Sequence, residues 1–239
     1  MRSYLFFLSF FLALYALPVS TTAQRYSAWD SLLGHYVTNK GFVDYKELKK
    51  KEGLMEEVLA EFRDQYPGPE ASSPKEVAYW INAYNAYAID LVLEHYPIES
   101  IRDIDRAFEK KFIELGDKRF SLDGIEKGII LKENEDPRLH YAVNCASISC
   151  PPLRDEAYKG GRLDRQLKDQ ALDFINDPEK NRLKKERVRI SKIYDWYRKD
   201  FTRNGSLIDH LNRYAKGVRI APGAEVKYME YDWGLNEKR

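Results

Sequence analysis

The segment 73–95 most constrains the fold, because it predicts a long helix that is apolar on two faces. It starts with Ser73, Pro74 and Glu76, which are an N-cap, a first-turn proline and a capping-box partner, and Pro97 follows its end. At about 100° per residue its two apolar faces consist of Val77, Trp80, Ile81, Tyr84, Ala88, Leu91 and Val92 on one side and Ala78, Asn82, Asn85, Ala86, Ile89 and Leu93 on the other. A helix with two apolar faces lies buried between layers, so we predict it at the centre of the fold.

Two asparagines, Asn82 and Asn85, lie one turn apart on the second of these faces. A buried amide must find partners, since leaving it unsatisfied costs about 1 to 3 kcal/mol. Two interpretations stay open: the amides tie loops to the helix, or they line the wall of a site and bind a substrate.

The other predicted elements are shorter and of both kinds. We predict helices in residues 27–41, 44–66, 123–131, 163–175, 191–201 and 206–217, and strands in residues 111–115, 120–122, 139–143, 188–190, 218–220 and 226–231. Helices dominate and short strands are scattered between them, so the predicted fold class is α+β, mainly helical with short antiparallel strands. No linker interrupts residues 24–239, which we interpret as a single domain.

The N-terminal residues have the pattern of a signal peptide. Arg2 is followed by an apolar run over residues 5–17 and by small residues that end at Ala23. The alternative is a membrane anchor, but the run is shorter than the roughly 20 residues that cross a bilayer. We therefore expect cleavage after residues 1–23, and a protein that is exported, periplasmic or extracellular, and not held by a membrane.

The charge balance narrows the classes of partner. Lys and Arg total 39 against 38 Asp and Glu, a net charge of +1, which argues against binding a nucleic acid by bulk charge. We expect a small-molecule, peptide or cell-envelope substrate and no cofactor.

The residues 136–153, DPRLHYAVNCASISCPPL, hold both cysteines and one of the four histidines. Cys145 follows an apolar, strand-like run and sits among small residues, with Ser147 as a local hydrogen-bond donor for a substrate or a thiolate. These features make Cys145 a candidate nucleophile. Cys150 is less suited, because Pro151 removes the next backbone amide, which could otherwise serve an oxyanion.

The catalytic base is less obvious than the nucleophile. If residues 139–145 formed one straight strand, His140 and Cys145 would be roughly 16 Å apart and on opposite faces. A Cys145–His140 dyad therefore needs a sharp turn at Asn144. Glu126 lies three residues after Asp123, as in a capping box, and either caps the helix 123–131 or orients His140 as a catalytic acid.

Two further roles for the cysteines remain open. His140, Cys145 and Cys150 could supply three ligands to a zinc ion, but no metal-binding spacing is present, and we expect no metal. In an exported chain the two cysteines could instead form a disulfide.

Five motifs in order resemble the family called domain of unknown function 547. They are YWINAYNA (79–86), IEKGII (125–130), DPRLHYAVNCASISCPPL (136–153), SKIYDWYRKDF (191–201) and YDWGLN (231–236). The resemblance implies an exported single-domain bacterial protein with no established reaction. It carries the family's pattern onto Glu126, His140, Cys145 and the pair Asn82 and Asn85. Plant-type relatives have serine where this chain has Cys150, which favours Cys145 as the functional thiol.

The combination of one thiol, one histidine and one acid also resembles a cysteine-peptidase-like or transglutaminase-like fold. In those families the histidine follows the cysteine, whereas here His140 precedes Cys145. Two classes of function follow. In the first, we expect a cysteine-dependent hydrolase or acyltransferase that acts on amide or ester bonds of the cell envelope, with Cys145, His140 and Glu126 as catalytic residues. Alternatively, the chain is a non-catalytic binding or scaffold domain with a Cys145–Cys150 disulfide.

Overall fold

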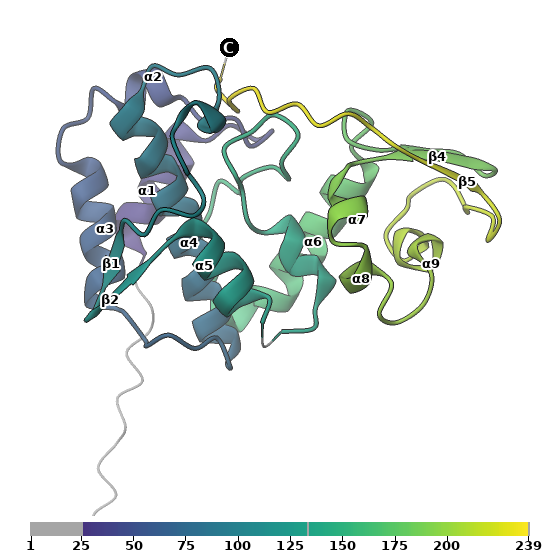
Figure 1. The fold of residues 1–239 in the computed structure, drawn as a ribbon, viewed down its shortest axis with the longest axis horizontal. Helices are drawn as coiled ribbons and strands as arrows, with labels where there is room; N and C mark the ends of the chain where they lie inside the picture. The colour runs from purple at the N-terminus through teal and green to yellow at the C-terminus, as the bar shows by residue number, and fades with distance from the viewer. Residues whose placement is uncertain (1–25, 133, 239) are drawn as a thin grey trace, which may run out of the picture.

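The structure is a computed structural model that describes residues 26–132 and 134–238 (Figure 1). The predicted signal peptide, residues 1–23, lies outside the described residues. Within these ranges, no helix combines the length and the apolar character needed to cross a membrane.

The first part of the chain is helical. Its helices are α1 (Ser27–Tyr36), α2 (Tyr45–Leu48), α3 (Leu54–Asp64), α4 (Pro74–His95) and the 3₁₀ turn η1 (Ile101–Asp103). The predicted helix 44–66 is divided between α2 and α3, because Gly53 adopts a φ of 78° at the start of α3. The helix α1 ends at Tyr36, before the predicted end at Gly41, because Val37 pairs with Val43.

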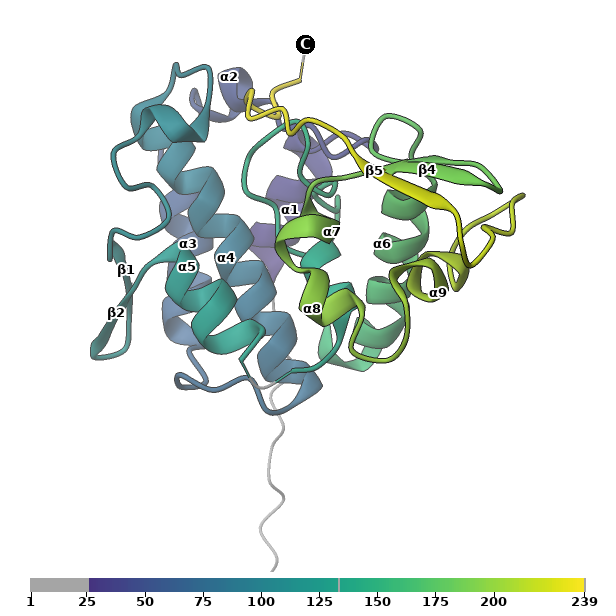
Figure 2. The ribbon, with the colours of Figure 1, turned by 45° about the vertical axis from the view of Figure 1, so that its right-hand side comes forward.

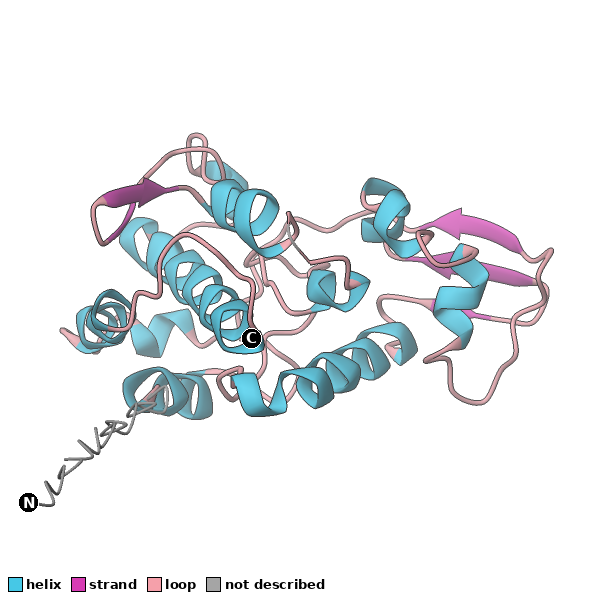
Figure 3. Cartoon of the chain, turned by 90° about the horizontal axis from the view of Figure 1, so that it is seen from below, coloured by secondary structure: helices cyan, strands magenta, loops and turns pink. Residues whose placement is uncertain are grey.

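The remaining elements are short apart from α6. They are β1 (Ile113–Leu115), β2 (Lys118–Phe120), α5 (Leu122–Ile125), the π-helix η2 (Glu126–Ile130), η3 (Pro137–Tyr141), η4 (Gly160–Arg162), α6 (Leu163–Asn176), β3 (Arg182–Leu183), β4 (Arg187–Ile190), α7 (Ile193–Trp196), α8 (Arg198–Phe201), α9 (Leu207–Asn212) and β5 (Glu225–Tyr228). Short strands at the edge of a helical body confirm the mainly helical α+β class (Figure 3).

The helix α4 forms the centre of the first hydrophobic core, as its two apolar faces predict. Ser73 and Glu76 form the expected capping box, with Pro74 in the first turn. Both Trp80, which is fully buried, and Leu91 belong to the core. The indole of Trp80 also donates to the carbonyl of Glu70 at 2.8 Å, so the buried ring leaves no polar atom unpaired.

A second core lies under the three-stranded sheet and α6. Tyr141, Phe174, Tyr194 and Phe201 pack together there, with ring centroids 4.8 to 6.3 Å apart in the pairs that touch. The 3₁₀ helix η3 connects the two cores, because Leu139 is buried in the first and Tyr141 in the second.

The segment 229–238 runs back from β5 over the first core towards α2, and we call it the C-terminal strap (Figure 2). Leu235 pairs with Ser147, and Glu237 pairs with Val43. The amide of Asn236 donates to Asn144 at 3.1 Å, and its carbonyl oxygen accepts from the hydroxyl of Tyr45 at 2.9 Å. The strap therefore covers the loop that contains both cysteines.

Other predictions of local structure are wrong. Residues 139–143 do not form a strand, because Asp136 caps and Pro137 opens a 3₁₀ helix, and a short apolar run does not distinguish the two conformations. Residues 218–220 do not pair with 226–231; instead β5 runs parallel to β4, while Asn212 holds both backbone groups of Ile220. The predicted helix 191–201 breaks at Tyr197 into α7 and α8.

Candidate active site

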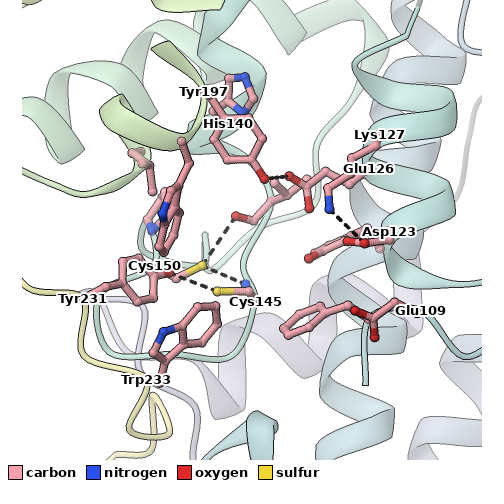
Figure 4. Close-up of a pocket in the computed structure, with 16 residues that line it drawn as sticks. Glu109, Asp123, Glu126, Lys127, His140, Cys145, Cys150, Tyr197, Tyr231 and Trp233 are labelled. Atoms are coloured by element: carbon pink, nitrogen blue, oxygen red, sulfur yellow. Dashed lines mark hydrogen bonds and ion pairs between the residues drawn. The ribbon is translucent and has the colours of Figure 1, made fainter. Parts of the chain in front are cut away.

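A pocket of about 440 Å³ opens between the two cores (Figure 4). Its walls come from α4, the loop before β1, α5, η2, η3, the loop that contains both cysteines, α7 and the strap. The lining residues are Tyr84, Phe108, Glu109, Asp123, Glu126, Lys127, His140, Val143, Cys145, Cys150, Pro151, Ile193, Trp196, Tyr197, Tyr231 and Trp233. In Figure 4, Tyr231 and Trp233 lie on one side, and the charged Glu109, Asp123, Glu126 and Lys127 lie on the other. The volume suits a small molecule or one side chain of a larger substrate.

The cysteine loop is held by a framework of asparagines. The side chain of Asn85 donates to the carbonyl of Ala142 at 3.0 Å and accepts from the amide of Asn144 at 2.8 Å. Asn144 in turn donates to the carbonyl of Pro151 at 2.8 Å and accepts from the amide of Ala146 at 2.9 Å. Ala146 is thereby kept at a φ of 57°, a conformation that residues with a Cβ rarely adopt.

Cys145 is a free thiol in the pocket, partly exposed, with polar partners on two sides. Its Sγ lies 3.1 Å from Oγ of Ser147 and 3.2 Å from the hydroxyl of Tyr231. Burial alone raises the pKa of the thiol, but hydrogen bonds with Cys150, Ser147 and Tyr231 outweigh it and lower the pKa below the ordinary value of 9.0. A thiol with this pKa has more thiolate character than an ordinary cysteine.

Cys150 is also a free thiol, but its setting is the opposite one. It is buried, and burial together with the neighbouring Cys145 raises its pKa well above the ordinary value. Its Sγ accepts a hydrogen bond from the backbone amide of Cys145 at 2.8 Å. Of the two cysteines, Cys145 is therefore the better nucleophile.

Glu126 is a pocket carboxyl and not a helix cap. The N-cap of α5 is Ser121, whose Oγ accepts from the amide of Gly124, so the predicted capping box of Asp123 and Glu126 is wrong. Glu126 begins the π-helix η2, a distortion often found at functional sites. The hydroxyl of Tyr197 donates to it at 2.7 Å. Burial raises the pKa of Glu126 above its ordinary value of 4.5, although the hydrogen bond from Tyr197 opposes that change.

His140 lines the same pocket, but it is not bonded to Cys145. Its Nε2 lies 3.0 Å from Oδ2 of Asp200, and its ring packs on that of Tyr197 with centroids 4.1 Å apart. The other ring nitrogen, Nδ1, is buried without a hydrogen-bond partner. Burial lowers the pKa of His140 despite Asp200, so the imidazole favours the neutral form. The Cys145–His140 dyad of the sequence analysis is not assembled by a hydrogen bond.

The three predicted substrate-binding residues, Asn82, Asn85 and Ser147, do not line the pocket. Asn82 joins α4 to a loop, because it accepts from the amide of Tyr158 at 2.9 Å and donates to its carbonyl at 2.8 Å. Asn82 and Asn85 are absent from the pocket wall and tie loops to α4, the first of the two interpretations above. Ser147 is buried behind the thiol, where its Oγ donates to the Tyr231 hydroxyl at 3.0 Å.

Sequence reasoning missed Tyr197, Asp200 and Tyr231 as candidate site residues. Tyr197 and Asp200 belong to the motif SKIYDWYRKDF, and Tyr231 begins the motif YDWGLN. Both motifs supported the family resemblance. The polar residues within them could therefore have been proposed as site residues from the sequence. They lie far along the chain from Cys145 and Glu126, so the contacts of Tyr231 with Cys145 and of Tyr197 with Glu126 could not be predicted from local spacing.

The metal interpretation finds no support in the geometry. Over residues 26–132 and 134–238, no group of three or more His, Cys, Asp or Glu side chains is arranged to hold an ion.

Comparison with known proteins assigns a family but no activity. Residues 69–175 match the family described as "Protein of unknown function, DUF547", which confirms the assignment made from the motifs. The match includes α4, Glu126, His140 and both cysteines, whereas Tyr197, Asp200 and Tyr231 lie beyond it. No curated protein and no solved structure matches the chain.

Proposed function

We propose that this chain, whose residues 69–175 match the DUF547 family, is a cysteine-dependent hydrolase or acyltransferase that acts on amide or ester bonds. The observation that carries the proposal is the placement of Cys145. Its Sγ lies within 3.2 Å of the Ser147 and Tyr231 oxygens, in a pocket whose opposite wall contains Glu126.

The proposed reaction begins with the thiolate of Cys145. Its sulfur attacks the carbonyl carbon of an amide or ester, and the carbonyl oxygen becomes an oxyanion. The carbon–nitrogen or carbon–oxygen bond then breaks, the leaving group takes a proton, and a thioester remains on Cys145. Water or an acceptor nucleophile attacks that thioester and regenerates the thiol.

Glu126 is the proposed proton donor to the leaving group. A carboxyl whose pKa is raised by burial keeps its proton at higher pH than an ordinary glutamate, as a general acid requires. Tyr197 holds the carboxyl in the pocket through its 2.7 Å hydrogen bond.

His140 is a positioning residue in this proposal. Its ring packs against Tyr197, and a hydrogen bond between its Nε2 and Asp200 fixes the orientation of the ring. The three residues Asp200, His140 and Tyr197 thus hold Glu126 at the wall of the pocket.

The cellular setting is part of the proposal. The charged start, the short apolar run and the small residues before Gln24 support export, with the periplasm or the extracellular space as the compartment. There the substrate class is an amide or ester of the cell envelope. An intact mass of the secreted protein that begins near Gln24 is the expected result, and a mass that retains residues 1–23 would contradict export.

The reaction is tested by trapping the thioester. The folded protein is incubated with an activated acetyl ester, quenched in acid and mapped by peptide mass. We expect an acetyl group on Cys145 that disappears on further incubation, no adduct in Cys145→Ala, and an adduct retained in Cys150→Ala. Equal acetylation of both cysteines, or none on Cys145, would exclude a catalytic thiol.

A non-catalytic binding domain is the second candidate, and one observation favours it. Trp196 is 48% exposed and packs with Tyr231 and Trp233 at the pocket, with centroids 4.8 and 6.0 Å away. Exposed aromatic groups of this kind mark binding surfaces. This interpretation gains if Cys145 never forms a thioester and if the cysteines of the isolated native protein are joined in a disulfide.

A further inference from the structure

The exposed face of the sheet β3–β4–β5 concentrates positive charge. The sheet lies at the end of the molecule away from α1, α2 and α3 (Figure 1). Its inner face is apolar, with Val188 and Ile190 fully buried in the second core. Its outer face has Arg182, Arg187, Arg189 and Lys227, all exposed.

Three of these cations stand in one row across the three strands. In the antiparallel pair Arg182 is opposite Arg189, and in the parallel pair Arg189 is level with Lys227. Like charges in directly opposed positions destabilise a sheet. The chain has nearly equal numbers of acidic and basic residues, so this row is a local concentration and not a consequence of overall charge.

The row is also poor in compensating acids. Among the described residues, Glu225 pairs with Lys227 at 2.8 Å and stands level with Arg187, whereas Arg182 and Arg189 have no acidic partner. Lys184, in the turn between β3 and β4, adds a further unpaired cation to the same face. The guanidinium groups of Arg182 and Arg189 therefore have N–H donors available to bind an anion.

The face is hollowed. A cavity of about 480 Å³ is lined by Arg182, Lys184, Arg187, Arg189, Lys227 and Tyr228. All the lining residues except the tyrosine are cations, and the volume falls within the range of small-molecule sites. Arginine pairs with phosphate through two parallel hydrogen bonds, so several arginines in one hollow suit a ligand with more than one phosphate group.

We propose that this hollow, the Arg189 site, binds a soluble small anion that carries more than one phosphate group. A membrane with phosphate headgroups offers similar chemistry, but the sheet lacks the apolar side chains that insert into a bilayer. Among the described residues, Trp196 is the one large hydrophobic side chain that is exposed. It lies at the pocket between the cores and does not line this hollow. The site is separate from the Cys145 pocket, and the proposal does not depend on the reaction proposed there.

Binding is tested with pyrophosphate as the probe, by calorimetry and by the shift in Tm. Wild-type protein should bind it saturably and gain several degrees in Tm, while sodium chloride at the same ionic strength should give no comparable shift. Arg189→Glu should weaken binding at least tenfold, because it places an anion in the middle of the row. Lys118→Glu, an exposed cation on the distant strand β2, is the matched control and should bind like wild type.

The unliganded variants add an independent readout. Arg189→Glu should be at least as stable as wild type without pyrophosphate, since it replaces two repulsions by two attractions. If this variant fails to fold, Arg182→Gln, which only removes a charge, should still weaken binding severalfold. Equal loss in Lys118→Glu, or a wild-type shift reproduced by sodium chloride, would overturn the proposal. Binding to vesicles of anionic phospholipid without binding to pyrophosphate would also overturn it, in favour of a membrane.

Discussion

The hydroxyl of Tyr197 donates a 2.7 Å hydrogen bond to Oε1 of Glu126, although 71 positions of sequence separate the two residues. The bond joins the motif SKIYDWYRKDF to the motif IEKGII across the pocket between the cores. The ring of Tyr197 is fixed in turn by His140. Tyr197 thus links a carboxyl and an imidazole that line the same pocket without contacting each other.

Tyr197→Phe should therefore destabilise the protein and raise the pKa of Glu126 further, because the buried carboxyl loses the stronger of its two tyrosine hydrogen-bond partners, Tyr197 and Tyr84. We expect a loss of about 1 to 3 kcal/mol in the free energy of unfolding, measured in urea. Tyr214→Phe is the control, since the Tyr214 ring is half-buried and its hydroxyl has no hydrogen bond in the described structure. Equal losses in the two variants would show that the Tyr197–Glu126 bond contributes nothing.

The Cys145 thiol should react with a small alkylating agent at lower pH than an ordinary cysteine, because its pKa is lowered, and Cys150 should react more slowly, because its pKa is raised. Tyr231→Phe should move the pH profile of Cys145 labelling upward, because it removes a hydrogen bond to the sulfur. His140→Ala should move it little, since no bond joins His140 to Cys145. A peptide two mass units light that labels only after reduction would show that the cysteines are bridged and would contradict the free-thiol site.

His210 should make stability fall in acid. It is buried, with Nε2 2.7 Å from the Tyr141 hydroxyl, and burial lowers its pKa from 6.5 to about 4. Below pH 6.5 the unfolded histidine takes up a proton that the folded one refuses, so stability is complete above pH 6.5 and is lost as the pH falls towards 4. The loss amounts to about 3 kcal/mol, at 1.36 kcal/mol per pKa unit.

This pH dependence is measured by urea unfolding between pH 4 and pH 7. His210→Gln should show a flatter slope than wild type, even if the variant is less stable throughout. His35→Gln, at an exposed position on α1, is the matched control and should keep the wild-type slope. An unchanged slope in His210→Gln would mean that other groups cause the acid sensitivity.

The central position of α4 predicts large costs for truncation there. Trp80→Ala and Leu91→Ala should each reduce the free energy of unfolding by roughly 2 to 5 kcal/mol, because they open cavities in the first core. Trp196→Ala removes the same ring type from a position that is 48% exposed and should cost much less. Similar unfolding curves for Trp80→Ala and Trp196→Ala would contradict the burial of α4.

Local signals in the sequence predicted the elements that local interactions define. The cap at Ser73, the first-turn proline and the two apolar faces together determine α4, and the structure has it at Pro74–His95. Residues 139–143 are apolar because Leu139 and Tyr141 enter two different cores, a requirement that a strand or a 3₁₀ helix meets equally well. Their conformation therefore could not be chosen from hydrophobicity alone.

The candidate site was predictable in its residue types but not in its connections. Cys145 was identified from its neighbours, and in the structure it lines the pocket between the two cores. The partner of His140 proved to be Asp200, and the partner of Glu126 proved to be Tyr197, both contributed by the second core. Such pairs depend on how the two cores meet, and no spacing within one segment encodes that.

The C-terminal strap makes the chemistry of Cys145 depend on the order in which the chain becomes available. Tyr231, which bonds the sulfur, follows Cys145 by 86 positions, and Asn236 supports the cysteine loop from 92 positions beyond Asn144. A growing or translocating chain that has exposed only the cysteine loop has a thiol without these partners. Such a chain lacks only the contribution of Tyr231 to the lowered pKa of Cys145, because Cys150 and Ser147, the other hydrogen-bond partners of Cys145, belong to the cysteine loop itself. The set of groups around the sulfur is thus complete only when the strap lies over the loop.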